Sequence, residues 1–137
     1  NMKLKFLILI SLFAVVFFSC KKDDSSSSSS TSTITGLWNG TYTWSGSSNA
    51  ISFSVLPGGV FYYRSKGASG ETLFTEGTWT LSGTAFTFNV ATVNLSPAKS
   101  QTGTATFNST DGTLTGGTIC DAGTGLNCSS FSVTKVK

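Results

Sequence analysis

The strongest constraint on the fold is a period of two in the sequence from residue 35 onward. Large apolar side chains alternate with Ser, Thr or Asn in segments 51–55, 86–90 and 131–134. This alternation is typical of half-buried β-strands, because successive side chains of a strand point to opposite faces. After residue 20, every helical spacing of apolar residues is broken by Gly or by β-branched residues. The sequence therefore predicts an all-β body.

The composition supports this prediction and excludes several classes of protein. Only 11% of the residues are charged, less than half of the roughly 25% of an average soluble protein. Residues that favour helices are scarce, which excludes a helical bundle, a coiled coil and an α/β nucleotide-binding fold. The chain has no His, which excludes a Ser-His-Asp triad, a Cys-His pair and a His-ligated metal site.

Turn signals divide the body into eight expected strands. They are rich in Gly, Pro, Asn and Ser, and they lie at 45–49, 57–59, 66–70, 82–83, 95–99 and 111–112. The expected strands between them are 36–45, 50–56, 60–65, 72–81, 84–94, 101–109, 112–119 and 129–136. Because all connections are short, neighbouring strands should pair antiparallel. This predicts an eight-stranded up-and-down barrel over residues 35–137, with a β-sandwich as the alternative.

The N-terminal segment 1–19 has the pattern of a signal helix that is removed after export. Lys3 and Lys5 precede an apolar run over 6–18, which is too short for the roughly 20 residues that cross a bilayer but fits a signal peptide. A short membrane anchor or a buried helix is the alternative. The formal charge of +3 includes these two lysines, so it is +1 from Cys20 onward. With a single Arg in the chain, no basic surface for nucleic acid is expected.

The residues around Cys20 resemble the lipobox of bacterial lipoproteins. Phe17-Phe18-Ser19-Cys20 carries this resemblance, with Phe17 where the family usually has Leu. The resemblance implies cleavage before Cys20 and attachment of fatty acyl chains, such as palmitate, to its sulfur. Two or three chains give stable membrane anchoring. The next four residues, Lys-Lys-Asp-Asp at 21–24, resemble the signal that exports lipoproteins to the outer-membrane surface. An anchored protein that faces the periplasm is the alternative.

Residues 20–34 are expected to form the lipidated Cys and a disordered tether. The Ser/Thr tract at 25–33 has no apolar residue to bury, so it cannot pack into a core. A flexible chain of this length spans on the order of 20 Å. The tether should therefore hold the barrel domain clear of the lipid headgroups.

Cys120 and Cys128 are expected to form a disulfide across the last hairpin loop. A signal peptide implies an oxidising compartment, and closing a loop of this length should stabilise the domain by about 2–3 kcal/mol. Two free thiols are the alternative. A zinc site is disfavoured, because two Cys without His or a second pair provide half of the ligands.

The start of the first expected strand resembles the Gly-x-Trp motif of the lipocalins and their calycin relatives. Gly36-Leu37-Trp38 carries the resemblance. It implies an eight-stranded barrel whose lower end is plugged by Trp38. Lys135 is the nearest substitute for the Arg that this family places near its last strand. In architecture, the chain looks like the small β-barrel lipoproteins of uncharacterised function found on bacterial outer membranes.

No set of residues points to catalysis, so the chain is not expected to be an enzyme or to hold a metal or cofactor. Ser and Thr are weak nucleophiles without a base, and Lys66 and Lys99 lie in expected loops where they are solvated. A carboxylate pair could hydrolyse glycosides. The acids of the domain are interpreted as turn, loop or solvent-facing strand residues, namely Glu71, Glu76, Asp111 and Asp121.

Aromatic residues are the candidates for ligand binding. They are Trp38, Tyr42, Trp44, Tyr62, Tyr63 and Trp79. The first three share one face of the first strand, and one of Tyr62 and Tyr63 should be exposed near Arg64, because both faces of that strand cannot be core. Such rings can stack on sugars or contact partner proteins. The alternative is that Tyr42 and Tyr62 pack under loops and keep a solvated hydroxyl.

Two functions remain open. The first is a non-enzymatic binding or interaction module of the cell envelope, with an envelope protein or a carbohydrate as partner. The second is a lipocalin-like carrier of a small apolar ligand, which needs a cavity above about 300 Å³. Many inward aromatic residues favour a filled or narrow interior, and any cavity should be lined by aromatic, nearly uncharged residues. The expected core is Trp38, Phe53, Phe61, Leu73, Trp79, Phe86, Phe88, Phe107, Leu114, Phe131 and Val133.

Overall fold

The computed structural model describes residues 33–67 and 69–137. Over these residues the chain forms eight strands and one short 3-10 turn, η1 (Pro57–Gly59). The strands are β1 (Gly36–Trp44), β2 (Ser47–Val55), β3 (Val60–Lys66), β4 (Thr72–Ser82), β5 (Ala85–Thr92), β6 (Ser100–Asn108), β7 (Thr113–Asp121) and β8 (Ser129–Lys135). Within the described ranges, no helix is long and apolar enough to cross a bilayer.

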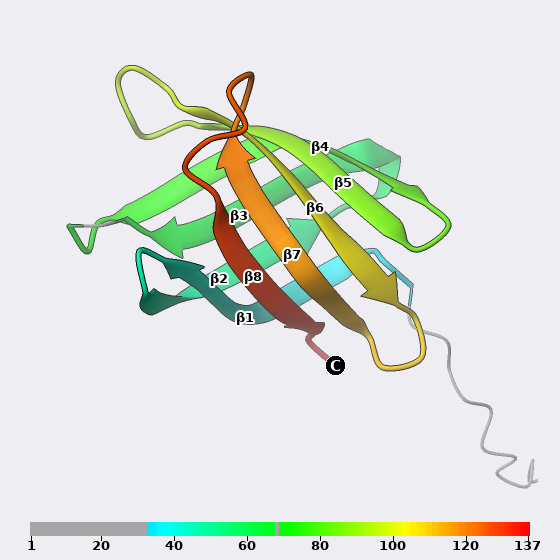
Figure 1. Ribbon diagram of the computed structural model, residues 1–137. Coiled ribbons are helices and arrows are strands. Elements are labelled where there is room, and N and C mark those ends of the chain that lie inside the picture. Colours follow the sequence, from blue (N-terminus) through cyan, green and yellow to red (C-terminus); the bar gives the residue numbers. More distant parts are fainter. Residues whose placement is uncertain (1–32, 68) are drawn as a thin grey trace, which may run out of the picture.

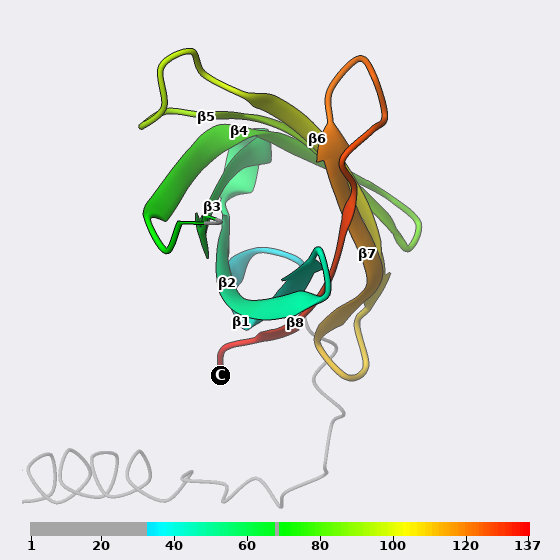
Figure 2. The ribbon, with the colours of Figure 1, turned by 60° about the vertical axis from the view of Figure 1, so that its left-hand side comes forward.

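The strands close into an up-and-down barrel (Figures 1 and 2). Each strand pairs antiparallel with the next one in sequence, and β8 pairs with β1, with Gly40 opposite Val133. The predicted all-β antiparallel barrel is confirmed, and the β-sandwich alternative is wrong. Closure leaves no unpaired strand edge, which suits a chain with few Lys and Pro to protect one.

The up-and-down order separates the connections into two ends. We call one end the closed end; it holds the β2–β3, β4–β5 and β6–β7 connections and both described ends of the chain (Figure 1). We call the other end the mouth; it holds the β1–β2, β3–β4, β5–β6 and β7–β8 connections. Because β1 starts at the closed end, whatever precedes it in the chain joins the barrel there.

Aromatic rings fill the interior toward the closed end. The ring centroids of Phe53 and Phe61 are 5.1 Å apart, those of Phe61 and Phe88 are 4.7 Å apart, and those of Phe53 and Phe131 are 5.1 Å apart. Trp38 is fully buried, and its indole N–H donates to the carbonyl of Ile34 at 3.0 Å. This part of the barrel is a packed core.

Lys135 fastens the first described residues to the closed end. It pairs with Trp38 across the β1–β8 seam. Its Nζ donates to the carbonyl oxygen of Thr33 at 2.7 Å and to the Thr33 hydroxyl at 3.1 Å. An added Cβ on Gly36 would lie 2.9 Å from Lys135 Cε, and the φ of Gly36, 136°, is one that other residues rarely adopt. The backbone conformation therefore favours glycine at this position.

Three details differ from the sequence-based expectation. Leu73 and Trp79 were expected in the core but are only half-buried, because β4 extends beyond the packed rings at both ends. The turn expected over 45–49 consists of Ser45 and Gly46 alone; both have positive φ, 46° and 80°, so a two-residue turn suffices. Strand β7 continues to Asp121, two residues beyond the end that the sequence predicted at 119.

The interpretations of the N-terminus fall outside the described residues. They are the signal helix at 1–19, the lipid attachment at Cys20, and the expected tether up to residue 32; residues 33 and 34, also expected in the tether, are described, and Ile34 is buried in the core. They remain predictions from the sequence.

Candidate functional site

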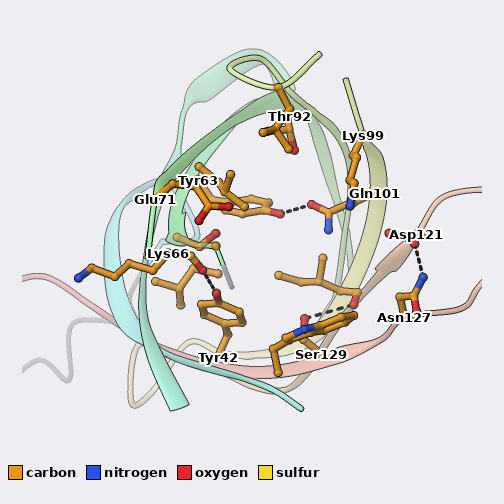
Figure 3. A pocket seen from close by; sticks show the side chains of 17 residues that line it. Tyr42, Tyr63, Lys66, Glu71, Thr92, Lys99, Gln101, Asp121, Asn127 and Ser129 are labelled. Atoms are coloured by element: carbon orange, nitrogen blue, oxygen red, sulfur yellow. Dashed lines mark hydrogen bonds between the residues drawn. The ribbon is translucent and has the colours of Figure 1, made fainter. Parts of the chain in front are cut away.

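A cavity of about 330 Å³ opens at the mouth (Figure 3). This volume lies at the lower end of the roughly 300–1,000 Å³ of ligand pockets. Every one of the eight described strands contributes to it. The lining residues are Tyr42, Trp44, Ile51, Tyr63, Ser65, Lys66, Gly67, Glu71, Leu73, Thr92, Leu95, Lys99, Gln101, Ile119, Asp121, Asn127 and Ser129.

The floor of the cavity is the phenol ring of Tyr63, which separates it from the packed core. Tyr63 is buried, packs against Phe88 with ring centroids 6.3 Å apart, and donates its hydroxyl hydrogen to Gln101 Oε1 (Figure 3). Burial raises the pKa of the Tyr63 hydroxyl to about 12. Ser65 and Thr92, also buried, line the same cavity. The buried part of the lining therefore includes hydroxyl groups.

The wall formed by β1 and the β3–β4 loop carries Tyr42 and Glu71. The Tyr42 hydroxyl donates to the backbone carbonyl of Lys66, whose ammonium points away from the cavity (Figure 3). Burial raises the pKa of Tyr42, and the nearby carboxylate of Glu71 adds to the rise. Glu71 lies against Gly67, where an added Cβ would come within 2.0 Å of a carboxylate oxygen. The Glu71 carboxylate therefore lies close to both Gly67 and the Tyr42 hydroxyl.

The opposite wall is the β7–β8 loop, which the predicted disulfide closes. Cys120 and Cys128 are bonded, with their Cα atoms 4.1 Å apart, so this prediction is confirmed. Inside the loop, Asn127 Nδ2 donates to Asp121 Oδ2 at 2.6 Å, and the Asp121 N–H donates to the Leu126 carbonyl at 2.9 Å. These bonds fix the Asp121–Asn127 pair at the rim (Figure 3).

The aromatic residues singled out from the sequence do not form one site. Tyr42, Trp44 and Tyr63 line the mouth cavity. Trp38 lies in the core at the other end. Trp79 is half-buried near that end, where its indole N–H donates to the Leu56 carbonyl at 2.8 Å.

Tyr62 points outward and is 42% exposed, so it is the exposed member of the Tyr62–Tyr63 pair. It borders a second, larger groove of about 720 Å³ on the outer face of β1 to β4, which Val93 and Val136 also line. Leu37 and Phe74, 57% and 46% exposed, lie in the same groove, and the Arg64 guanidinium lies 5.6 Å from the Phe74 ring centroid. This groove is open to solvent and mostly apolar.

The expectation that a cavity would be nearly uncharged is wrong. Glu71, Lys99 and Asp121 line it together with the amides of Gln101 and Asn127. Sequence reasoning missed the two amides as site residues. Their side chains meet only because the barrel closes, and neither stands in a local motif. The spacing of turns could have pointed to them, since every second connection must lie at the same end.

The mouth offers hydrogen-bonding groups and no paired nucleophile and base. Glu71 and Asp121 border the cavity from opposite walls (Figure 3). Among the described lining residues, no hydroxyl is hydrogen-bonded to a lysine ammonium or to a carboxylate. In the same part of the chain, no three His, Cys, Asp or Glu side chains are grouped so that they could hold a metal ion.

Fold and site together define a class: a small, closed, antiparallel β-barrel that is solid at one end and carries a polar cavity at the other. Comparison with protein-family models, with curated proteins and with solved structures found no match.

Proposed function

We propose that this protein is a lipid-anchored, non-enzymatic binding module of the bacterial envelope that takes a small ligand into its mouth cavity. One observation carries the proposal. The cavity lies at the end of the barrel opposite to the end where the chain enters. A tether joined to the closed end leaves the mouth accessible.

The sequence supports the anchor. The lipobox-like residues before Cys20 and the Ser/Thr tract lead to Thr33, which Lys135 holds at the closed end. If Cys20 carries acyl chains, the closed end faces the membrane and the mouth faces away from it. We favour the outer-membrane surface, on the Lys-Lys-Asp-Asp sequence, over a periplasm-facing position. The barrel with Trp38 at its base supports the lipocalin-like resemblance in architecture.

The residues that line the cavity indicate the polarity of the ligand. A purely apolar molecule would bury Gln101 and the Asp121–Asn127 pair without replacing their contacts with water, which is unfavourable. The proposed ligand therefore carries polar groups beside an apolar surface. A carrier of a small apolar ligand is the alternative, and the polar lining favours it less.

The anchor is tested by replacing Cys20→Ala and fractionating the cells. We expect the variant to leave the membrane fraction; membrane association equal to wild type would overturn the anchor.

The cavity is tested with Ile119→Trp, which places a larger side chain on the lining. We expect this variant to lose the small molecules that co-purify with the native protein and are detected by mass spectrometry. Ile119→Leu, which keeps the volume of this side chain, is the matched control at the same position. Retention of the same ligand by Ile119→Trp would place it elsewhere.

A protein partner is the second candidate function, and the outer groove favours it. Exposed Leu37, Tyr62 and Phe74 form an apolar surface of a kind that contacts other proteins. Tyr62→Ala should then remove an envelope protein that is cross-linked to the wild type in cells. Unchanged cross-linking would exclude this face.

A further inference from the structure

We infer that the mouth cavity binds a neutral sugar unit. The inference rests on the proposed function and specifies the chemical class of its ligand. It follows from the hydrogen-bonding capacity that the described lining residues leave unused, from the apolar surfaces between them, and from the placement of the charges.

Two tyrosine hydroxyls on the lining have already donated their hydrogens. Tyr42 donates to the Lys66 carbonyl, and Tyr63 donates to Gln101 Oε1. The Tyr42 oxygen also faces the Ser65 hydroxyl, and the Tyr63 oxygen faces the Thr75 hydroxyl. Each phenol oxygen therefore has at most one further acceptor position for a ligand. The Tyr63 contact also orients the Gln101 amide, so that its NH₂ group is the part left for a ligand.

The β7–β8 side is arranged in the same way. Asn127 Nδ2 donates to Asp121 Oδ2, and the Ser129 hydroxyl donates to the Ile119 carbonyl at 3.4 Å. The second carboxylate oxygen of Asp121, the amide oxygen of Asn127 and the Ser129 oxygen remain as acceptors. On the facing wall, the Glu71 carboxylate accepts no hydrogen bond from any described residue.

Most of the lining groups that remain free to bind a ligand are therefore hydrogen-bond acceptors. The Gln101 amide and the Lys99 ammonium are the donors. A ligand that fits them donates several hydrogen bonds and accepts a few. Hydroxyl groups do both, and a sugar ring carries several of them around its edge. A carboxylate or phosphate ligand offers acceptors only and would face the carboxylates of Glu71 and Asp121.

Apolar surfaces lie between the polar groups. Trp44, Tyr42 and Ile51 border the same cavity. The C–H faces of a sugar ring pack against aromatic rings, while its hydroxyls reach the polar groups at the edge. A cation would find no single anionic pocket, because the carboxylates of Glu71 and Asp121 stand on opposite walls and the Lys99 side chain lines the same cavity (Figure 3). A neutral, amphipathic ring satisfies the whole lining.

The test is a glycan array probed with the purified protein. The array carries neutral glycans, glycans with uronic acids and glycans with free amino sugars. In parallel, the fluorescent apolar probe N-phenyl-1-naphthylamine is titrated into the protein. We expect saturable binding to neutral glycans, with an affinity that changes less than about twofold between low and high salt, because no net charge is recognised.

Two variants locate the site, and one serves as control. Trp44→Ala should weaken glycan binding about tenfold by removing the aromatic surface. Gln101→Glu keeps an acceptor for Tyr63 but replaces the free donor with a charged acceptor, and it should weaken binding by a similar factor. Tyr62→Ala, on the outer groove, should leave binding unchanged. Circular dichroism verifies that each variant is folded.

The outcomes separate the inference from the proposed function. If the apolar probe binds and no glycan does, the sugar inference is overturned and the proposed binding function stands. Preference for acidic or amino glycans, with strong salt dependence, also overturns it. If Tyr62→Ala rather than Trp44→Ala abolishes binding, the site is the outer groove and the inference fails. If neither probe nor glycan binds and no small molecule co-purifies with the native protein, the proposed function fails as well.

Discussion

Two buried glycines make room for aromatic rings on the barrel wall. A Cβ added at Gly103 would lie 2.1 Å from the Phe88 ring, and one added at Gly117 would lie 2.5 Å from the Phe131 ring. Both glycines stand directly opposite these rings on the neighbouring strand. At these positions a missing side chain lets a ring lie flat across the sheet.

We expect Gly103→Ala to lower the free energy of unfolding by about 1–3 kcal/mol, because the Phe88 ring must leave its place in a packed core. Urea denaturation measures the change. In a Phe88→Leu background the penalty should shrink, since the ring is gone. An equal penalty in both backgrounds would contradict the contact.

Tyr63 should make the protein sensitive to alkaline pH. Its pKa is raised from the usual 10.0 to about 12, mainly by burial. The unfolded chain therefore loses the phenol proton at lower pH than the folded chain, so stability is full below pH 10 and falls as the pH rises toward 12. Tyr63→Phe should remove this part of the decline and cost about 1 kcal/mol at pH 7 through the lost bond to Gln101.

Urea titrations at a series of alkaline pH values check this expectation. Tyr62→Phe, one position away and exposed, is the matched control and should keep the wild-type decline. A Tyr63→Phe variant with the same alkaline slope as wild type would show that other groups set it.

Among the elements, the β7–β8 loop links stability to the site. The Cys120–Cys128 disulfide closes it, and Asp121 and Asn127 inside it border the cavity. We expect the Cys120→Ser, Cys128→Ser double variant to lose about 2–3 kcal/mol of stability, because the unfolded chain regains freedom. Amide hydrogen exchange should rise in this loop and stay unchanged in the β4–β5 turn at the closed end. Equal protection of the loop with and without the bond would contradict its role.

The strands could be predicted because each one buries alternate residues. In β3, Phe61 and Tyr63 point inward while Tyr62 and Arg64 point outward, and this period stands in the sequence itself. The turn after β1 was predicted too long. The composition of 45–49 indicates that a turn exists. Its length depends on the backbone conformation, because the positive φ of Ser45 lets a turn of two residues connect the strands.

For the whole molecule, the sequence predicted closure but only part of the site. Tyr42 and Tyr63 were among the candidates and do border the cavity, whereas Trp38 was a core residue. Gln101 and Asn127 were not identified, because their role depends on where closure places strands that are distant in the chain. The local pattern fixes which face a residue points to, but the depth along the barrel axis depends on the whole register.

The last prediction concerns how the anchored molecule stands on a membrane. Strands of this length separate the closed end from the mouth by roughly 20–25 Å. If the chain is anchored through Cys20 and enters at the closed end, a fluorophore there should lie nearer the lipid than one at the mouth. Thr110→Cys in the β6–β7 turn and Ser48→Cys near the β1–β2 turn, both exposed, accept such labels.

In vesicles that contain an acceptor-labelled lipid, energy transfer from position 110 should exceed transfer from position 48. The Cys20→Ala variants of both should show none, because they no longer bind. Greater transfer from position 48 would mean that the mouth faces the lipid. The cavity would then receive its ligand from the membrane side, and the proposed display of an open mouth toward the surroundings would be wrong.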